Sequence, residues 1–571
     1  MKLITKIQNP KSQSLLLLLI WLIIGICLRL TNLASKSPWT DEFSTLVFSL
    51  GNSFLPVPLD QPISVDVLLQ PLQPHPSAGI KDVLSHLLTE SNHPPLYFIL
   101  THFWVKLFPT QGGLVSLWGA RSLAAIFGAA SIPAIYALCK LAFRSRLISH
   151  LAAAMMATSP YSIFLAQEAR HYTLSILWVI ASFACLVIVT RHIHNHTQIP
   201  FWVAISWVAI NALGIATHYF FTLTLCAEAF VLLFLAWQEK SKGFSFPSFQ
   251  SPWLRIYAAA AGTAVAGLVW LPVFLQNSYG SKLTDWIQSP RVGLAWVSPI
   301  FQALAAWITM ISLLPVEAPQ LGIVIASGLL MLIFFIWAVP ILIHGFKVQL
   351  QQPETRLMVQ VFTGLVIGAM ALFFIFTYFL GIDLTRGARY NFVYFPAVIV
   401  LLGVSLAVCW QTPHGEKVRW GRSGKQAVMI IWVMGLVSAI VVTCNLGYQK
   451  YYRPDIFVQL IREISHVPVL IATTQKTHVH IGEMMGVARE FKIQNSDIKT
   501  HLSPLFLLAH QDEDPNTSTA TLQNTFKTLS RPFDLWLVNF YAPKPEEVKS
   551  CVPETQSLPS VNGYEYEIYH C

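Results

Sequence analysis

The chain has 571 residues, of which 54% are hydrophobic and only 11% are charged, against roughly 25% charged in an average soluble protein. This balance excludes folding of the whole chain in water. The 37 Lys+Arg exceed the 28 Asp+Glu, but membrane proteins collect basic residues in their cytoplasmic loops. The basic excess therefore predicts no nucleic-acid partner, and the composition predicts a protein of the lipid bilayer.

The N-terminal sequence has the charge layout of a signal peptide, with MKLITKIQNPK followed by LLLLLIWLIIGICL. The apolar run is long and no convincing cleavage site follows it, so we interpret it as an uncleaved first helix. A membrane-spanning helix needs roughly 20 mostly apolar residues. The sequence predicts an all-α polytopic membrane protein with about eleven spans, near 14–33, 113–142, 147–166, 172–190, 200–217, 219–237, 255–276, 321–345, 357–380, 390–410 and 426–446.

The loop charges orient these helices. With the N-terminus in the cytoplasm, the inner segments hold sixteen lysines and arginines against three acids, whereas the outer connections hold eight against ten acids. This bias satisfies the positive-inside rule and predicts a multi-pass protein of the cell (plasma) membrane. If the short apolar run at about 300–314 crossed the membrane, the basic loop after Lys417 would lie on the outer side, against the positive-inside rule. We therefore expect an interfacial or re-entrant outer helix there.

The two longest polar regions are expected outside the membrane. The first outer loop, about 34–112, is too long for a connector and contains amphipathic pieces such as IKDVLSHLL. After about 447, VPVLIATT, FDLWLVNF and YEYEIYH are typical of strands, and VQLIREIS is typical of a helix. The predicted organisation is a transmembrane domain at 1–446, including this loop, and a small extracytoplasmic α/β cap domain at 447–571.

Six of the eight cysteines lie in apolar runs, where a small buried side chain is the expected role. Cys551 and Cys571 occupy polar sequence in the cap and would face an oxidising compartment, where they could form a disulfide or remain inert thiols. The sequence has no CxxC motif and no Cys/His cluster with zinc spacing, which argues against a cysteine-based metal site.

Polar residues at the predicted outer helix ends share one membrane depth. SPWTDEF places Asp41 and Glu42 shortly after a tryptophan, and SNHPPLYFILTHFW places His93 before two prolines that stiffen a helix entry. The remaining candidates come from LAQEARHYTL, between two spans, and from DLTRGARYNFVYFP, which leads into a late span: Glu168, Arg170, His171, Arg386, Arg389 and Tyr390.

Each candidate also has a purely structural interpretation. Asp41 and Glu42 could be a helix N-cap pair, Arg389 could be an interfacial anchor, and the other charges could be solvated loop residues. Glu228, within FTLTLCAEAFVLLF, is the one carboxylate predicted deep in a span. It either pairs with a histidine or arginine of a neighbouring helix or shows that the predicted boundary is displaced, and we assign it no function.

The candidates contain the groups that one reaction class needs. Transfer of a sugar from a phosphate leaving group requires a carboxylate that accepts the proton of the acceptor hydroxyl. It also requires cations that stabilise the charge developing on the phosphate. Both kinds of group are predicted at one depth.

These stretches resemble the class C membrane glycosyltransferases, family 39-like, in the branch of the protein O-mannosyltransferases and the lipid A aminoarabinose and pentosyl transferases. The resemblance covers about residues 14–410 and rests on PWTDEF, HPPLYFILTHFW, AQEARHYTL and RGARYNFVYFP. It implies an enzyme that moves a sugar from a polyprenyl-phosphate-linked monosaccharide to a hydroxyl of a lipid, glycan or protein. The direct displacement would invert the sugar carbon.

The resemblance also implies roles for single residues. Asp41 is the implied base, with Glu42 beside it. Glu168 is the implied second acid, near Arg170 and His171, and with Asp41 it is expected to hold a divalent metal cation, whose hard character suits oxygen ligands. The implied contacts to the donor phosphate are Arg386, Arg389, Tyr390 and His93.

The chain departs from this pattern at His93, where relatives in the aminoarabinose branch have lysine before the paired prolines. A histidine contact to phosphate depends on pH. Two rival classes are a polytopic transporter or lipid flippase and a membrane receptor. The first would be expected to show internal repeats and a midplane cluster of ionisable groups. The second leaves the 34–112 loop and its acidic pair unexplained.

Overall fold

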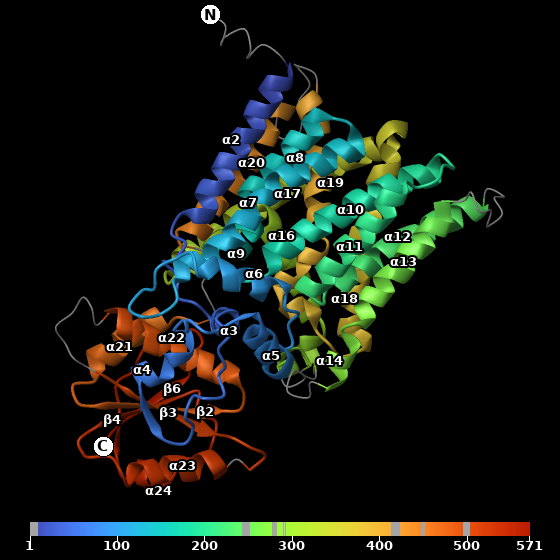
Figure 1. The fold of residues 1–571 in the computed structure, drawn as a ribbon. Helices are drawn as coiled ribbons and strands as arrows, with labels where there is room; N and C mark the ends of the chain where they lie inside the picture. The colour runs from blue at the N-terminus through green and yellow to red at the C-terminus, as the bar shows by residue number, and fades with distance from the viewer. Residues whose placement is uncertain are drawn as a thin grey trace, which may run out of the picture.

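The computed structural model places a bundle of apolar helices on one side and an α/β layer on the other (Figure 1). The N-terminal end of helix α2 (Pro10–Leu30) lies at the end of the bundle far from the α/β layer. The structure describes residues 10–241, 252–276, 283–288, 291, 293–412, 423–446, 452–494, 503–514 and 516–571. Parts of the loops used to predict orientation, such as 413–422, lie outside these ranges.

Within the residues that the structure describes, eight stretches of helix are long and apolar enough to cross a membrane, and each matches a predicted span. Many leucines and phenylalanines on their outer faces are exposed, as expected for helices whose surroundings are lipid. The protein is therefore a multi-pass membrane protein. The eight are α2, α7 (Leu117–Phe143), α10 (Tyr172–His194), α12 (Phe221–Ser241), α13 (Pro252–Leu268) continued by α14 (Leu271–Gln276), α17 (Leu321–Gln351), α18 (Pro353–Phe379) and α20 (Gly424–Thr443).

The three other predicted spans are shorter, so the count of eleven stays a prediction. Helices α11 (Phe201–Thr217) and α19 (Phe395–Gln411) have 17 residues each. The predicted helix 147–166 is divided into α8 (Arg146–Thr158) and α9 (Pro160–Ala166). The break follows from Ser159, whose side chain caps α9, and from proline at the first position of that helix.

A buried arginine supports this break from inside the bundle. Arg29 of α2 is 0% exposed. It donates to the carbonyls of Met156 and Ala157 at the end of α8 and to the Ser162 hydroxyl of α9. These bonds satisfy carbonyls that the end of a helix leaves without partners. They fix the direction of α9 and of the turn that follows it, which carries Glu168, Arg170 and His171.

The predicted outer connections form short elements at the end of the bundle that faces the α/β layer. The amphipathic piece predicted on the first loop is helix α5, with Val83 and Leu87 buried. The late segment at 300–314 is α16 (Ser298–Ile311), whose 14 residues are too few for a span. The remaining elements here are α3 (Thr40–Ser49), β1 (Pro62–Ser64), α4 (Val65–Leu68), η1 (Gln70–Leu72), α5 (Ile80–Glu90), α6 (Leu96–Val105), η2 (Asp285–Ile287), η3 (Gly293–Trp296), η4 (Leu384–Arg386) and η5 (Ala388–Val393).

The C-terminal part confirms the predicted α/β architecture. Its elements are α21 (Pro454–Ile464), β2 (Val469–Gln475), α22 (His478–Gln494), β3 (Leu505–His510), α23 (Asn516–Phe526), β4 (Asp534–Val538), α24 (Glu546–Lys549), β5 (Val552–Pro553) and β6 (Tyr566–His570). Strand β2 runs parallel to β3 and β4, and its seven residues are all buried.

The sheet also includes a strand that the sequence did not predict. Its order is β1-β3-β2-β4-β6-β5, and β1 pairs antiparallel with β3. Because β1 comes from residues 62–64, the first outer loop contributes an edge strand to the layer predicted at 447–571. We call the whole layer, including β1, the cap. A disulfide joins Cys551 to Cys571, so the oxidised alternative is confirmed.

Candidate active site

The acidic pair lies at the start of α3, at the junction of bundle and cap. Trp39 is the N-cap residue, so Asp41 and Glu42 both occupy the first helical turn and neither caps it. Negative side chains are favoured there by the helix dipole. The two carboxylates have different surroundings, since the Asp41 side chain is 27% exposed and that of Glu42 is 0% exposed.

Glu42 is held in a buried ion pair. Arg121 of α7 donates through Nε and Nη2 to its two carboxylate oxygens, at 2.7 and 2.8 Å. The backbone N–H of Ala169 donates to the same carboxylate at 2.9 Å. The third nitrogen of Arg121 bonds the carbonyls of Leu33 and Lys36. Glu42 therefore ties α3 to the first loop, to α7 and to the turn after α9.

Asp41 faces two other guanidinium groups. Its Oδ2 lies 3.4 Å from Nη2 of Arg170 and 3.6 Å from Nη2 of Arg389. Arg170 also donates to the Asp41 carbonyl and to the Thr45 hydroxyl. The Nε atoms of both arginines are buried and have no hydrogen-bond partner among the residues that the structure describes. Because buried donors are normally bonded, these groups indicate a place for an acceptor-rich ligand.

His93 contacts Arg170 directly. A guanidinium can only donate, so the 2.9 Å contact between its Nη2 and Nε2 of His93 makes Nε2 the acceptor. The Nδ1–H of His93 then donates to the Ser91 hydroxyl at 3.1 Å. Burial, followed by the charge of Arg170, keeps the pKa of His93 well below its usual range. The imidazole is thus neutral and orients Arg170, and neither ring nitrogen has a free proton for a phosphate.

The predicted residues near η5 surround Asp41 from the other side. The guanidinium of Arg389 lies 4.8 Å from the Trp39 ring, 5.3 Å from the Trp286 ring and 5.4 Å from the Tyr390 ring, in cation–π geometry. Arg386 pairs instead with buried Asp383 at 3.6 Å and donates to the Trp286 carbonyl. Arg389 therefore reaches the acidic pair, whereas Arg386 contacts Asp383 and Trp286 in the wall around it.

The turn after α9 contributes a fully buried imidazole. The His171 ring lies 5.3 Å from that of His93 and 4.5 Å from that of His218. His171 is 0% exposed, and within the described ranges neither of its nitrogens has a hydrogen-bond partner. Glu168, 2% exposed, is close enough to act electrostatically on Arg389. The structure thus brings Asp41, His93, Glu168, Arg170, His171, Arg389 and Tyr390 into one region.

Three contributors were missed in the sequence. Arg121 could have been found, because a charge inside the apolar stretch LWGARSLAAIFG is costly unless it is paired. Trp39 was noted only as an anchor in the same motif as Asp41. Trp286 lies in a polar connection about 100 residues from Arg389, and its sequence context gives no signal.

The residues around Asp41 do not fit the expected divalent cation. Two guanidinium groups already lie 3.4 and 3.6 Å from Oδ2 of Asp41, so positive charge next to this oxygen is supplied by the chain itself. Among the described residues, no group of three or more His, Cys, Asp or Glu side chains is arranged to hold a metal ion. We therefore derive no step through a metal.

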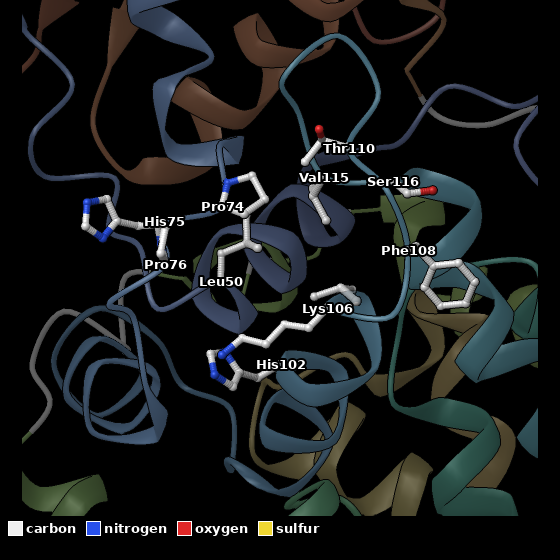
Figure 2. A pocket seen from close by; sticks show the side chains of 11 residues that line it. Leu50, Pro74, His75, Pro76, His102, Lys106, Phe108, Thr110, Val115 and Ser116 are labelled. Atoms are coloured by element: carbon white, nitrogen blue, oxygen red, sulfur yellow. The ribbon is translucent and has the colours of Figure 1, made fainter.

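A hollow of about 310 Å³ lies within the first loop, and none of the predicted site residues lines it. It is formed by the end of α3, the end of α6 and the segment after α6 (Figure 2). His102 of α6 and Lys106, which directly follows this helix, both line the hollow. His102 is bonded to the Ser49 carbonyl, so its imidazole supports the wall.

No family model and no curated protein matches the chain. Among solved structures, it is similar to ArnT from Cupriavidus metallidurans bound to undecaprenyl phosphate, at 12% identity and a TM-score of 0.49, over 98% of both chains. It is also similar to the apo oligosaccharyltransferase of Archaeoglobus fulgidus, at 12% identity and a TM-score of 0.45, over 93% of this chain and 70% of that one. A third similar structure is the S. cerevisiae protein O-mannosyltransferase Pmt1-Pmt2 complex bound to the sugar donor. The identity is 14% and the TM-score 0.33, over 47% of this chain and 35% of that one. Similarity at these values assigns no activity to the chain.

Proposed function

We propose that the protein is an integral membrane glycosyltransferase that takes a sugar from a polyprenyl-phosphate-linked monosaccharide. The acceptor is a hydroxyl group of a lipid, a glycan or a protein on the extracytoplasmic face. The observation that supports this most is the convergence of a partly exposed carboxylate, Asp41, with the guanidinium groups of Arg170 and Arg389. The buried Nε–H groups of these arginines have no hydrogen-bond partner among the described residues, and a ligand rich in acceptor oxygens would satisfy them.

The reaction class follows from the charges of these groups. A phosphate carries several acceptor oxygens, and guanidinium groups are the side chains best suited to bind them. A carboxylate beside that site suits removal of a proton from an attacking hydroxyl. An arginine pair alone would serve a phosphate-binding protein, whereas the added carboxylate favours a transfer reaction.

In the proposed mechanism, Asp41 accepts the proton of the acceptor hydroxyl as the oxygen attacks the anomeric carbon of the sugar. The new carbon–oxygen bond forms on the face opposite the phosphate, so the configuration inverts. The bond from the sugar to the phosphate oxygen breaks, and its electron pair stays on the polyprenyl phosphate. Arg170 and Arg389 stabilise the charge that develops on this leaving group.

The other residues of the site position Asp41, Arg170 and Arg389. Glu42 positions Asp41, because its bonds to Arg121 and Ala169 fix the first turn of α3. His93 positions Arg170 through its Nε2 acceptor, so its predicted direct contact with phosphate is replaced by an indirect role. Trp39, Trp286 and Tyr390 hold the Arg389 guanidinium in place.

A lipid-linked donor agrees with the position of the site. The Asp41 region lies where the bundle meets the cap, and the helices beside it expose apolar side chains along their outer faces. A polyprenyl chain would remain among these lipid-facing surfaces while its phosphate reached the arginines. We place this end of the bundle outside the cytoplasm on the basis of the loop charges.

The activity is tested with purified protein and radiolabelled polyprenyl-phosphate sugars, offered with membrane lipids, glycans and peptides as acceptors. We expect release of polyprenyl phosphate together with labelled acceptor. Asp41→Asn should abolish both products, with membrane insertion intact. Near-normal turnover by Asp41→Asn would exclude this role of the carboxylate.

A transporter or flippase is the rival class, and one observation speaks for it. Glu228 of α12 is 2% exposed and interacts with Ser182 and Trp207, so a carboxylate does lie buried among spans. No described histidine or arginine is recorded as its partner. The same assay separates the classes, because a transporter moves the labelled lipid across liposomes without releasing polyprenyl phosphate.

A further inference from the structure

Helix α22 of the cap lies against the segment that carries Asp41. His478, Gly482, Gly486 and Glu490 recur at every fourth position of the sequence, which places them along one face of the helix. All four contact or closely approach the segment from Ser37 to Phe54. From His478 to Glu490, α22 therefore contacts α3 and the residues on either side of it.

The middle of this face has two glycines that permit a close approach. A Cβ atom added to Gly482 would lie 3.5 Å from Cα and 3.7 Å from Cβ of Thr40, the residue before Asp41. A Cβ atom added to Gly486 would lie 3.6 Å from the Phe43 ring. An alanine fits at these distances, but a side chain as bulky as leucine at Gly482 would push α3 and α22 apart.

Polar and aromatic contacts fix the two ends of the face. Near the end of α22, the Ser37 hydroxyl donates to the Glu490 carboxylate at 2.9 Å. At its start, the His478 ring stacks on the Phe54 ring, with centroids 4.9 Å apart. His478 is close enough to Asp41 and His93 for their charges to act on one another.

Contacts outside α22 hold the same two parts of the chain together. Strand β1 pairs with β3, and the Asp60 carboxylate accepts from the backbone N–H of His510 and from the Thr521 hydroxyl. The last turn of α22 adds one more contact, because its Lys492 pairs with Asp66 at 2.7 Å. The first loop and the cap thus form one continuous layer with its own apolar core.

We propose that α22 sets the position of the Asp41 base and stays docked on α3 throughout turnover, with Gly482 as the positioning residue. This inference rests on the proposed transferase activity for its kinetic readout. The arginines that grip the phosphate come from the bundle, at Arg170 and Arg389. A change at Gly482 should therefore move the carboxylate relative to Arg389, which also stacks on Trp286 and Tyr390 outside α3.

The first test compares Gly482→Leu with Gly482→Ala and with Ala520→Leu, the same kind of enlargement on the exposed face of α23. A displacement of about 1 Å can cost about 100-fold in rate. We expect Gly482→Leu to lower kcat by about that factor while KM for the donor stays within about twofold. Gly482→Ala and Ala520→Leu should leave kcat within about twofold. An unchanged kcat in Gly482→Leu, or an equal loss in Ala520→Leu, would overturn the proposal.

The second test does not depend on the leucine variant folding. Disulfides place their two Cβ atoms about 3.8 Å apart, close to the 3.7 Å between Thr40 and a Cβ atom at Gly482. The double variant Thr40→Cys/Gly482→Cys should therefore cross-link on oxidation. We expect the oxidised and reduced forms to turn over at the same rate within about twofold. Wild-type protein given the same reductant controls for reduction of the Cys551–Cys571 bond.

The outcomes separate this proposal from the proposed function. Failure of the double variant to cross-link, or loss of turnover on oxidation with recovery on reduction, would show that α22 is not docked there during catalysis. Both results require an active wild type that Asp41→Asn inactivates. If the wild type releases no polyprenyl phosphate from any donor, the transferase proposal fails instead, and cross-linking still reports whether α22 lies on α3.

Discussion

The two sides of the first turn of α3 carry adjacent carboxylates with opposite surroundings. Glu42 is fully buried and bonded to Arg121 and Ala169 at 2.7–2.9 Å. Asp41 is partly exposed, and its nearest charged atoms are 3.4 and 3.6 Å away. A carboxylate whose oxygens are all bonded stabilises structure, whereas one with loose partners can exchange them for a substrate. This difference is the reason for proposing Asp41 as the base and Glu42 as the residue that positions it.

The largest effect is expected from removing the base. Asp41→Asn keeps the shape of the side chain but cannot accept a proton, so kcat should fall by about 10²–10⁴-fold. Because the Asp41 pairs are long and partly exposed, the midpoint of thermal unfolding should change little. Steady-state kinetics and thermal unfolding in detergent test both statements. A variant that is inactive only because it is unfolded would contradict the contrast with Glu42.

The second-largest effect is expected from removing a guanidinium group that is proposed to bind the phosphate. Arg389→Ala should lower kcat by about 10²–10³-fold, as removal of a group that stabilises developing charge does elsewhere. Arg389→Lys keeps the charge but loses the planar group that stacks on Trp39 and Trp286, and should recover only part of the rate. Inhibition by added polyprenyl phosphate should weaken in both variants. If the lysine variant matches wild type, the aromatic contacts are not needed.

Substitution of Glu42 should lower the free energy of unfolding. Glu42→Gln leaves Arg121 buried without its counter-charge, which typically costs about 3–5 kcal/mol. The double variant Glu42→Leu/Arg121→Met removes both charges and should recover much of that loss. Thermal unfolding of the two variants beside wild type measures this recovery. A double variant no more stable than Glu42→Gln would show that the hydrogen bonds of Arg121 to Leu33 and Lys36 dominate.

The smallest effect concerns pH and the contact between α22 and α3. Burial lowers the pKa of His478 to about 4, although the Asp41 carboxylate opposes this and His480 adds to it; His93 also faces the ring. The unfolded chain takes up this proton below about pH 6.5 and the folded chain only near pH 4. Stability should therefore fall as pH drops through this window and be unaffected above it. His478→Gln should flatten the fall in unfolding temperature between pH 6.5 and 4.5.

Sequence reasoning was most successful where the signal is local. Eight of the about eleven predicted spans match long apolar helices among the described residues, because twenty apolar residues in a row leave few alternatives. The predicted helix 147–166 was divided by Ser159 and Pro160, a break that hydrophobicity alone does not show. The buried strands of the cap were predicted from their apolar runs.

The parts that could not be predicted depend on distant partners. Strand β1 is three residues long and pairs with residues more than 400 positions away. The difference between Asp41 and Glu42 follows from Arg121, which meets the first turn of α3 only in the folded chain. For the same reason His93 was predicted to bind phosphate directly, since its contact with Arg170 is not visible in the sequence.

The pairing of β1 with β3 has a consequence for biogenesis. Residues 62–64 leave the ribosome long before residues 505–507, to which they pair. The first loop, with its acidic pair, therefore cannot pair with β3 until nearly the whole chain has been synthesised. A polypeptide that ended after the last span would insert its helices yet leave α3 without α22. Any protease that removed the final 120 or so residues would have the same result. The C-terminal part must therefore be synthesised before α22 can contact α3.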